Sequence, residues 1–367
     1  MENINENSRP SGIELLRTLC GIFGPCGNEE RVRDKIADIL KDSGIASEKD
    51  RIGNLFVKIP GGGEGYDPEN PVKIMISAHM DEVGFMVRDI DADGYIRFIC
   101  VGGIDPCVLC GKRVVFMGAE GEVKGVIASK AIHHKTAEER TTAVKIENMY
   151  VDIGAEDYED ASRWLAVGDY GRFDSEFVRF GINDAFIKAP AIDDRLGCAV
   201  IIETLKRLAS EGKKLPFDLI AGFTVREEIG KSGAGMAARR FLPDYSVVLE
   251  STAVADLPDV KPNSRVAAAG GGGVISLLDR STIYDADLVS AALELGEKKG
   301  IPVQIKKYLS GGNDAGSIHK SAYGTACLAI SAPSRYIHSA ANVICAEDYF
   351  SIRELVYAIL TEHSFKK

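Results

Sequence analysis

Hydrophobic residues recur along this chain with two different periods. A spacing of three to four residues, typical of one face of a helix, predicts two helices within residues 12–43, separated by the Gly24-Pro25-Cys26-Gly27 turn. The same spacing predicts further helices over residues 194–208, 233–240, 286–299 and 347–363. Apolar runs bounded by turn residues predict strands over residues 54–59, 72–78, 218–225, 245–251, 302–309 and 324–331.

The segment from about residue 85 to 185 has a different pattern. Short β-like stretches such as YIRFICVG and GEVKGVIA are separated there by glycine and aspartate, which indicates a small β-rich module. On either side of it strands alternate with helices, and this alternation predicts an α/β fold with a mostly parallel sheet. We therefore expect one α/β domain, formed by residues 1–86 and 185–367, with a β-rich domain inserted at 87–184.

Composition and charge exclude several classes of protein. The chain has 367 residues, of which 45% are hydrophobic, and its formal net charge is −10. The hydrophobic content is ordinary for a folded protein, and the negative charge argues against nucleic acid as the main partner. No apolar run of about 18 residues predicts a membrane span, and the polar N-terminus does not resemble a secretory signal, so we expect a cytoplasmic protein.

The eight cysteines are scattered along the chain. Only Cys107 and Cys110 form a close pair, and a zinc ribbon needs a second such pair. We therefore expect reduced, buried thiols.

Candidate chemistry gathers in five short segments, nearly all directly after a predicted strand. In open α/β sheets, ligands bind at the carboxyl ends of the strands. Each segment alone has an ordinary structural explanation, such as a core histidine, a helix N-cap or a solvated loop. Together they supply imidazoles and carboxylates without thiolate, a donor set that suits zinc, cobalt or manganese. The residues are His79 with Asp81, Asp193 with Asp194, Glu227 with Glu228, Glu250 and His338.

Spacing within these segments suggests a division of labour. In an extended chain Asp81 shares a face with His79, so it can support the imidazole. One carboxylate of the Asp193-Asp194 pair can cap the following helix while the other binds metal. Adjacent side chains point in different directions, so one glutamate of the pair at 227–228 can bind metal while the other acts on water.

These segments, with the phrases AHMDEVGF, GGNDA and RYIHS, resemble metallopeptidase family forty-two, the tetrahedral (TET) and glutamyl-aminopeptidase-like dinuclear metallo-aminopeptidases. The similarity covers nearly the whole chain, including the β-rich insertion. It implies a phosphorylase/hydrolase-like α/β sandwich with an inserted PDZ-like or barrel-like dimerisation domain. It also implies peptides with a free N-terminus as substrates, and a homo-oligomer that is either a dimer or a hollow tetrahedral dodecamer.

The resemblance further implies a role for each candidate residue. Two divalent ions per subunit are expected, zinc or cobalt in the first place and manganese as an alternative. Asp193 would bridge the ions, His79 and Glu250 would complete one site, Glu228 and His338 would complete the other, Glu227 would be the general base, and Asp81 would support His79. Two positions depart from the family pattern, because Glu250 stands where aspartate is usual and Asn342 where glutamate is frequent.

Two other functions remain as alternatives. The acidic pairs, and the name endoglucanase given to some family members, suggest a glycoside hydrolase. That chemistry gives the histidines no role, and its aromatic-rich sites contrast with the single tryptophan here, Trp164 in the insertion. The second alternative is a non-catalytic scaffold whose insertion binds peptide ends. His133 and His134 lie in a polar stretch, which we interpret as a loop and not as a metal site.

Overall fold

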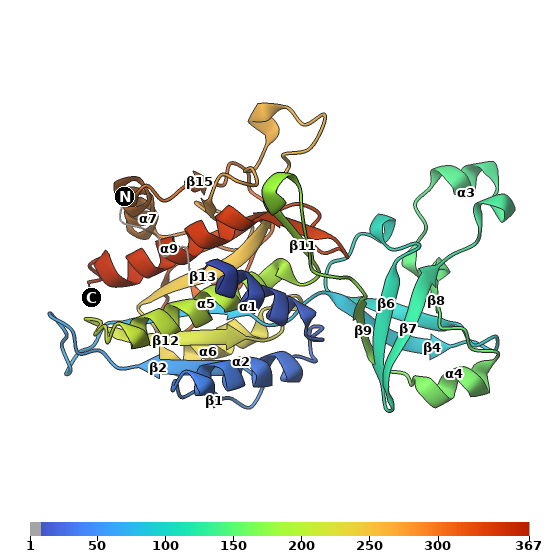
Figure 1. Ribbon diagram of the computed structural model, residues 1–367, viewed down its shortest axis with the longest axis horizontal. Coiled ribbons are helices and arrows are strands. Elements are labelled where there is room, and N and C mark those ends of the chain that lie inside the picture. The colour runs from blue at the N-terminus through green and yellow to red at the C-terminus, as the bar shows by residue number, and fades with distance from the viewer. Residues whose placement is uncertain (1–8, 367) are drawn as a thin grey trace.

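An eight-stranded mixed sheet forms the centre of the larger part of the molecule (Figure 1). The computed structural model describes residues 9–366. In spatial order the strands are β1 (Glu48–Lys49), β2 (Leu55–Ile59), β12 (Asp218–Thr224), β3 (Lys73–His79), β13 (Tyr245–Ala253), β16 (Ala326–Ser334), β14 (Gly273–Ile275) and β15 (Val303–Ile305). Neighbours are parallel from β12 to β16, whereas the β1–β2, β2–β12 and β16–β14 pairs are antiparallel.

Helices sandwich this sheet, as its sequence requires. In β3 and β12 every residue after the first is buried, which is typical of parallel strands covered on both faces. The helices are α1 (Arg9–Gly21), α2 (Glu30–Asp42), α5 (Ile192–Ser210), α6 (Ser232–Phe241), α7 (Ala286–Lys299), α8 (Ala315–Ile318) and α9 (Ala346–Glu362). The predicted α/β class is therefore confirmed.

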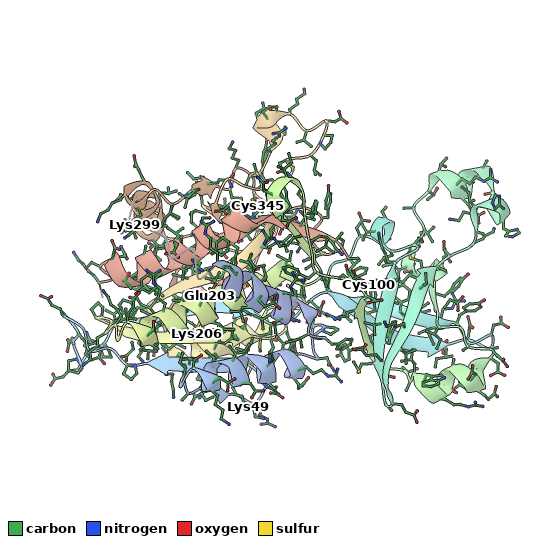
Figure 2. The ribbon with its side chains drawn as sticks, in the orientation of Figure 1. Lys49, Cys100, Glu203, Lys206, Lys299 and Cys345 are labelled. Atoms are coloured by element: carbon green, nitrogen blue, oxygen red, sulfur yellow. The ribbon has the colours of Figure 1, made fainter. Side chains whose placement is uncertain are left out.

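Helix α5 is the central helix of the covering layer. It packs against β3 and β13 and contacts both α1 and α9, so its first half is buried all round. Glu203, labelled on α5 in Figure 2, accepts a hydrogen bond from Tyr349 and lies 3.2 Å (Oε1 to Nη1) from Arg353, both on α9. These contacts fix the helix whose first residues carry Asp193.

The inserted segment forms a closed six-stranded barrel beside the sheet, at the right of Figure 1. In the barrel order the strands are β4 (Gly84–Ile90), β5 (Ile96–Val101), β8 (Tyr150–Asp152), β7 (Gly121–Ala128), β6 (Arg113–Gly118) and β9 (Tyr170–Phe173). Phe85 fills the interior and makes edge contacts with Phe98 and Phe173 at centroid distances of 5.4 and 5.0 Å. Two short helices, α3 (Ala137–Thr141) and α4 (Tyr158–Trp164), lie between the later strands. The insertion is thus barrel-like, whereas the division of the chain at residues 86/87 and 184/185 stays a prediction.

A small antiparallel sheet brings two distant segments together. It contains β10 (Val178–Phe180), β11 (Phe186–Ala189) and β17 (Asn342–Cys345), with Ala189 paired with Asn342. The chain continues from β11 into the start of α5, and the residues before β17 carry His338. Pairing of these strands therefore makes the Asp193 and His338 segments neighbours.

Two sequence predictions are wrong in detail. The strand predicted at 302–309 covers only Val303–Ile305, because its neighbour β14 is three residues long and offers no further partners. Cys107 and Cys110 are exposed in the loop after β5, and Cys100 is half-buried, whereas the other five thiols are buried as predicted. The short strands β10, β11, β14 and β17 were not predicted.

Within residues 9–366 no helix is long and apolar enough to cross a membrane.

Candidate metal centre

The carboxyl ends of the central parallel strands bring the predicted segments to one place. His79 is the last residue of β3 and pairs in register with Thr224, the last residue of β12. The turn after Thr224 therefore carries Glu227 and Glu228 past His79. On the other side Val248 pairs with Ser77, which sets Glu250 level with His79.

Asp193 lies between the two histidines. The Nε2 atom of His79 is 3.4 Å from Asp193 Oδ1 and 3.6 Å from Glu250 Oε2. The Nε2 atom of His338 is 3.4 Å from Asp193 Oδ2 and 3.2 Å from Glu228 Oε1. Each carboxylate oxygen of Asp193 therefore faces a different imidazole.

Both imidazoles are oriented through their other ring nitrogen. His79 Nδ1 is 3.1 Å from the Asp81 carbonyl oxygen and 3.5 Å from Asp81 Oδ1. His338 Nδ1 is 2.7 Å from the carbonyl oxygen of Gly103, which lies in the barrel loop between β5 and β6. Such contacts favour the tautomer with hydrogen on Nδ1, which leaves Nε2 free as a ligand. The contact from Gly103 carries no side-chain signal, so the sequence could not have indicated it.

The donor set fits divalent cations. Asp193 Oδ1 and Glu250 Oε1 are buried and accept no hydrogen bond from any residue between 9 and 366, although a buried carboxylate oxygen without a partner is costly. A pocket lined by Asp193, Glu228 and His338 opens beside them. Imidazole nitrogens and carboxylate oxygens converge there without thiolate, a combination that suits zinc, cobalt or manganese.

Burial and crowding shift the pKa values in this cluster. Burial alone would lower the pKa of His338, but the carboxylates of Asp193 and Glu228 outweigh it and raise that pKa to about 11. Burial would likewise lower the pKa of His79, and Glu250, Asp193 and Asp81 together hold it well above its usual value. Burial raises the pKa of Glu227 to about 8. Without a cation, protons bound to these groups therefore offset part of the negative charge of the carboxylates.

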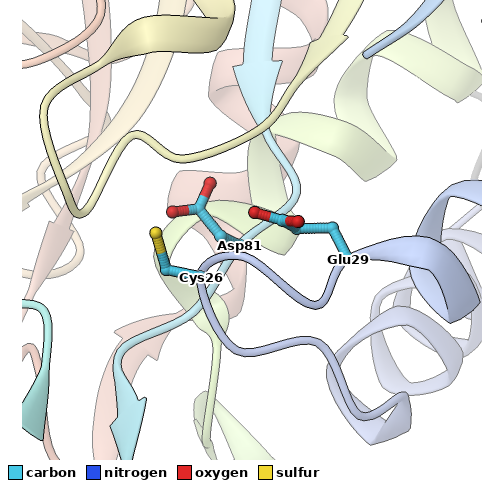
Figure 3. Close-up of side chains that lie close together, drawn as sticks. All are labelled: Cys26, Glu29 and Asp81. Atoms are coloured by element: carbon cyan, nitrogen blue, oxygen red, sulfur yellow. The ribbon is translucent and has the colours of Figure 1, made fainter. Parts of the chain in front are cut away.

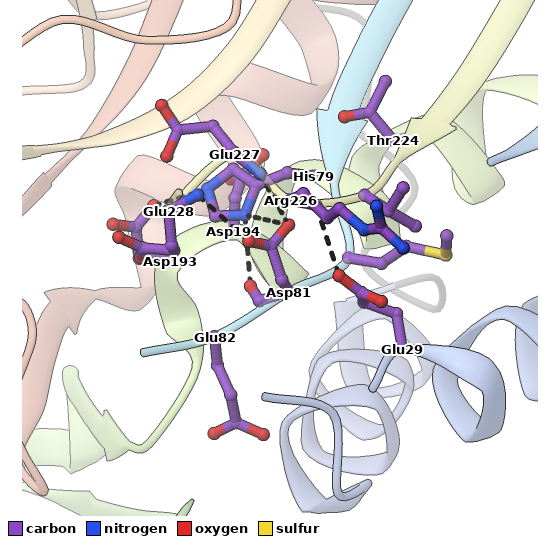
Figure 4. A network of polar contacts seen from close by, with 12 residues as sticks. Glu29, His79, Asp81, Glu82, Asp193, Asp194, Thr224, Arg226, Glu227 and Glu228 are labelled. Atoms are coloured by element: carbon purple, nitrogen blue, oxygen red, sulfur yellow. Dashed lines mark hydrogen bonds and ion pairs between the residues drawn. The ribbon is translucent and has the colours of Figure 1, made fainter. Parts of the chain in front are cut away.

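The remaining acidic residues of these segments have distinct environments. Asp194 Oδ1 accepts a hydrogen bond from the Gly197 amide at 3.1 Å, as expected of the capping member of the pair. Glu227 Oε1 lies 3.1 Å from Lys231 Nζ. Glu82 points away from the cluster (Figure 4), and its Oε1 is 3.4 Å from Nη2 of the buried Arg195.

Asp81 also belongs to a second buried group, with Cys26 and Glu29 (Figure 3). Both Asp81 oxygens accept backbone amides, from Glu227 and Glu228. Burial and the neighbouring Asp81 raise the pKa of the Cys26 thiol far above its usual range, so the thiol stays protonated. Burial, followed by Asp81, raises the pKa of Glu29 to about 7. These oxygens and this thiol are already engaged, so we do not assign an ion to this group.

Comparison with known proteins identifies the family. The sequence model of the M42 glutamyl aminopeptidase family matches residues 53–355, well over half of the chain. The chain belongs to the M42 aminopeptidase family. It is therefore a hydrolase that acts on peptides.

Individual M42 relatives match along nearly their whole length. A protein of Acetivibrio thermocellus, named as a candidate aminopeptidase, is 35% identical, with 95% of this chain and 98% of the relative covered. The crystal structure of a TET aminopeptidase from a marine sediment Thaumarchaeota archaeon superposes with a TM-score of 0.91 at 31% identity and covers 97% of both chains. The TET1 peptidase of Pyrococcus horikoshii, described as assembling into a tetrahedron or a large octahedral shell, has a TM-score of 0.82 at 33% identity and covers 96% of this chain and 100% of that one.

The residues outside the cluster are equally informative. His133 and His134 are exposed in a short helical turn of the segment that connects the barrel strands β7 and β8, in agreement with the loop interpreted from the sequence. Asn342, where the family pattern frequently has glutamate, is buried at the start of β17 and lines the same pocket as His338. Glu29 and Asn54, which contact the Glu227-Glu228 turn, were not predicted.

Proposed function

We propose that this M42 aminopeptidase removes N-terminal residues from peptides with the help of two divalent ions per subunit. The observation that carries the proposal is the position of Asp193, whose two oxygens face His79 and His338 separately. A carboxylate in that position suits a bridge between two ions. The glycoside hydrolase alternative has no such support, since it gives neither imidazole a role.

The proposed ligand sets follow from the distances. Asp193, His79 and Glu250 would hold one ion. Asp193, His338 and Glu228 would hold the other. Glu250 is longer than the usual aspartate, and its carboxylate still lies beside His79. Its buried Oε1 accepts no hydrogen bond from the described residues, which supports a role as a metal ligand. Asp81 would orient His79 from behind. Zinc or cobalt is the expected metal and manganese the alternative.

Glu227 is the proposed general base. When bound, the two ions would polarise the scissile carbonyl and make the attacking water more acidic. Glu227 would take a proton from that water and return it to the leaving amine. It is the glutamate of the pair that does not contact His338, so its carboxylate is available for proton transfer. Lys231 lies close enough to hold that carboxylate in place.

The first test removes only the proton acceptor. Glu227→Gln should lower kcat on aminoacyl-anilide substrates by about 10²–10⁴-fold while both ions stay bound. Asp193→Ala should instead lose metal, measured by elemental analysis, since it removes the shared ligand. Chelation of the wild-type protein should abolish turnover, and zinc or cobalt should restore it. Retained peptidase activity in Glu227→Gln would refute the assigned base.

We also propose that the chain forms a homo-oligomer in the cytoplasm, with the barrel as the dimerisation domain. The likeness to a TET1 peptidase that assembles into closed shells supports a dimer or a tetrahedral dodecamer.

A further inference from the structure

The turn that carries Glu227 and Glu228 is held by side chains from other segments. Four consecutive backbone amides, from residue 225 to 228, donate to side-chain oxygens. Figure 4 shows two of the acceptors, Glu29 and Asp81, beside the turn. The acceptors come from the residue before β2, the residue before α2 and the segment after β3. The pairs are Val225 N to Asn54 Oδ1 at 3.0 Å, Arg226 N to Glu29 Oε1 at 3.2 Å, Glu227 N to Asp81 Oδ1 at 3.1 Å, and Glu228 N to Asp81 Oδ2 at 3.0 Å.

Arg226 is the strained point of this turn. Its φ angle is +60°, a conformation that residues with a side chain seldom adopt. Such a conformation persists only where the surroundings hold it. The Arg226 side chain is exposed, and the hydrogen bond from its amide to Glu29 fixes its backbone directly before the proposed base.

The side chain of Glu29 does not cap the helix that it precedes. It stands at the N-cap position of α2, yet its side chain makes no capping hydrogen bond. The carboxylate is buried, with 4% of the residue exposed, and accepts the amides of Gly27 at 2.7 Å and Arg226 at 3.2 Å. It also lies beside the buried carboxylate of Asp81 (Figure 3).

We propose that Glu29 is a positioning residue for catalysis, which sets Glu227 and Glu228 by fixing the backbone of Arg226. The proposal rests on the proposed function, because it takes Glu227 as the base and Glu228 as a ligand. Asp81 already holds the amides of 227 and 228 directly. Glu29 extends that support to the residue where the chain turns, so the direction in which Glu227 leaves the turn depends on it.

The test compares two substitutions of the same residue. Glu29→Gln keeps an oxygen acceptor of the same length, whereas Glu29→Ala leaves the amides of Gly27 and Arg226 without an acceptor. We expect Glu29→Ala to lower kcat at least tenfold with KM within about twofold of wild type. Glu29→Gln should retain kcat within about threefold.

A matched control lies at the far end of β12, the strand that leads into the turn. Asp218, the first residue of β12, accepts the Gly61 amide at 2.9 Å and the Tyr66 hydroxyl at 3.0 Å. Asp218→Ala therefore removes a comparable carboxylate acceptor far along the strand from the turn. It should lower the melting temperature without changing kcat. If Asp218→Ala lowered kcat as much as Glu29→Ala, the effect would be general loosening and the proposal would fail.

A second readout does not depend on activity. Hydrogen–deuterium exchange of the metal-free protein, followed in a peptide spanning 222–232, should be faster in Glu29→Ala and unchanged in Glu29→Gln. Unchanged exchange in Glu29→Ala, or an equal loss of kcat in both variants, would overturn the positioning role. A wild-type protein without peptidase activity would refute the proposed function instead, and the exchange result would still decide how Glu29 acts on the turn.

Discussion

At the scale of single residues, Arg195 is an unusual part of the core. Its guanidinium is fully buried and donates to the carbonyl oxygens of Met80 and Leu19, both at 2.6 Å. Its Nη2 atom also forms an ion pair with Glu82 Oε1, 3.4 Å away. A buried charge is tolerated only when it is paired and hydrogen-bonded, and Arg195 meets both conditions.

Replacing this arginine should cost far more than replacing one on the surface of the same helix. Arg195→Met breaks the buried ion pair with Glu82 and removes a donor from several buried carbonyl groups, so the free energy of unfolding should fall by about 3–5 kcal/mol. The control is Arg207, an exposed arginine on the same helix that forms ion pairs with Glu211 and Glu354. Arg207→Met should cost less than about 1 kcal/mol. Urea unfolding measures both, and equal losses would contradict this account of Arg195.

The cluster also predicts how the metal-free protein responds to pH. His338, with its pKa raised to about 11, contributes stability that is complete below its unfolded value near 6.5 and declines as the pH rises. Glu227, with its pKa raised to about 8, disfavours the folded state increasingly as the pH rises toward that value. Between pH 6.5 and 8 the folded state therefore binds more protons than the unfolded chain, and its stability falls with rising pH.

The expected fall is about 3 kcal/mol across that window, because each of the two groups binds close to one more proton in the folded state than in the unfolded chain. Chelated protein should show this fall in urea unfolding. His338→Ala should flatten the slope, because it removes one of the two titrating groups. Stability that rises with pH in the chelated protein would show that the signs are wrong.

At the scale of elements, the loop between β5 and β6 links the barrel to the proposed metal centre. Gly103 in this loop accepts from His338. Gly102 has φ +89°, and a Cβ atom there would lie 2.8 Å from Val83 Cγ1 and 3.3 Å from Glu228 Cβ. The loop therefore contacts two proposed metal ligands, Glu228 through Gly102 and His338 through Gly103.

Two glycines of this loop form a matched pair for a test. Gly111 has φ +81°, and a Cβ atom there would meet no atom of the described part of the chain within 4 Å. Both alanine variants bear the strain of a positive φ, about 1–2 kcal/mol, but only Gly102→Ala presses on Val83 and Glu228. Gly102→Ala should lower kcat at least tenfold, whereas Gly111→Ala should lower only the melting temperature. Similar kinetics in the two variants would argue against the contact.

Elements with a strong local pattern were predictable, and those defined by their neighbours were not. The apolar run of β3 and the spacing of α5 are properties of the segments themselves. Strand β14 has three residues and exists because β16 pairs with it. Among the site residues, those beside apolar strands were found. Glu29 was missed because an acidic residue before a helix is ordinary, and only the tertiary fold carries it to Arg226.

At the scale of the whole molecule, the barrel is joined firmly to the sheet-containing part. Arg172 on β9 donates to the carbonyl oxygens at the end of α1, including Gly21 at 2.8 Å, and lies 3.6 Å from Glu82. Arginine at this position satisfies carbonyl groups that a helix end leaves free. The orientation of the barrel relative to the proposed metal centre is thereby defined.

The assembly proposed for this chain has a direct test. Multi-angle light scattering should give a mass that is a multiple of the 39.6 kDa chain. The mass should stay constant over a dilution series if the assembly is closed and stable. A single-chain mass throughout the series would contradict the proposed homo-oligomer.

The four amides of residues 225–228 have a consequence for the order of synthesis. Their acceptors, at positions 29, 54 and 81, all precede them in the chain. On the ribosome these acceptors are made first, and strand β12 then enters between β2 and β3 and brings the turn to them. A circular permutant that begins at residue 93, in the exposed turn between β4 and β5, and carries residues 1–92 at its end would reverse this order. Its refolding from denaturant should match that of the natural order, while its yield from translation should fall.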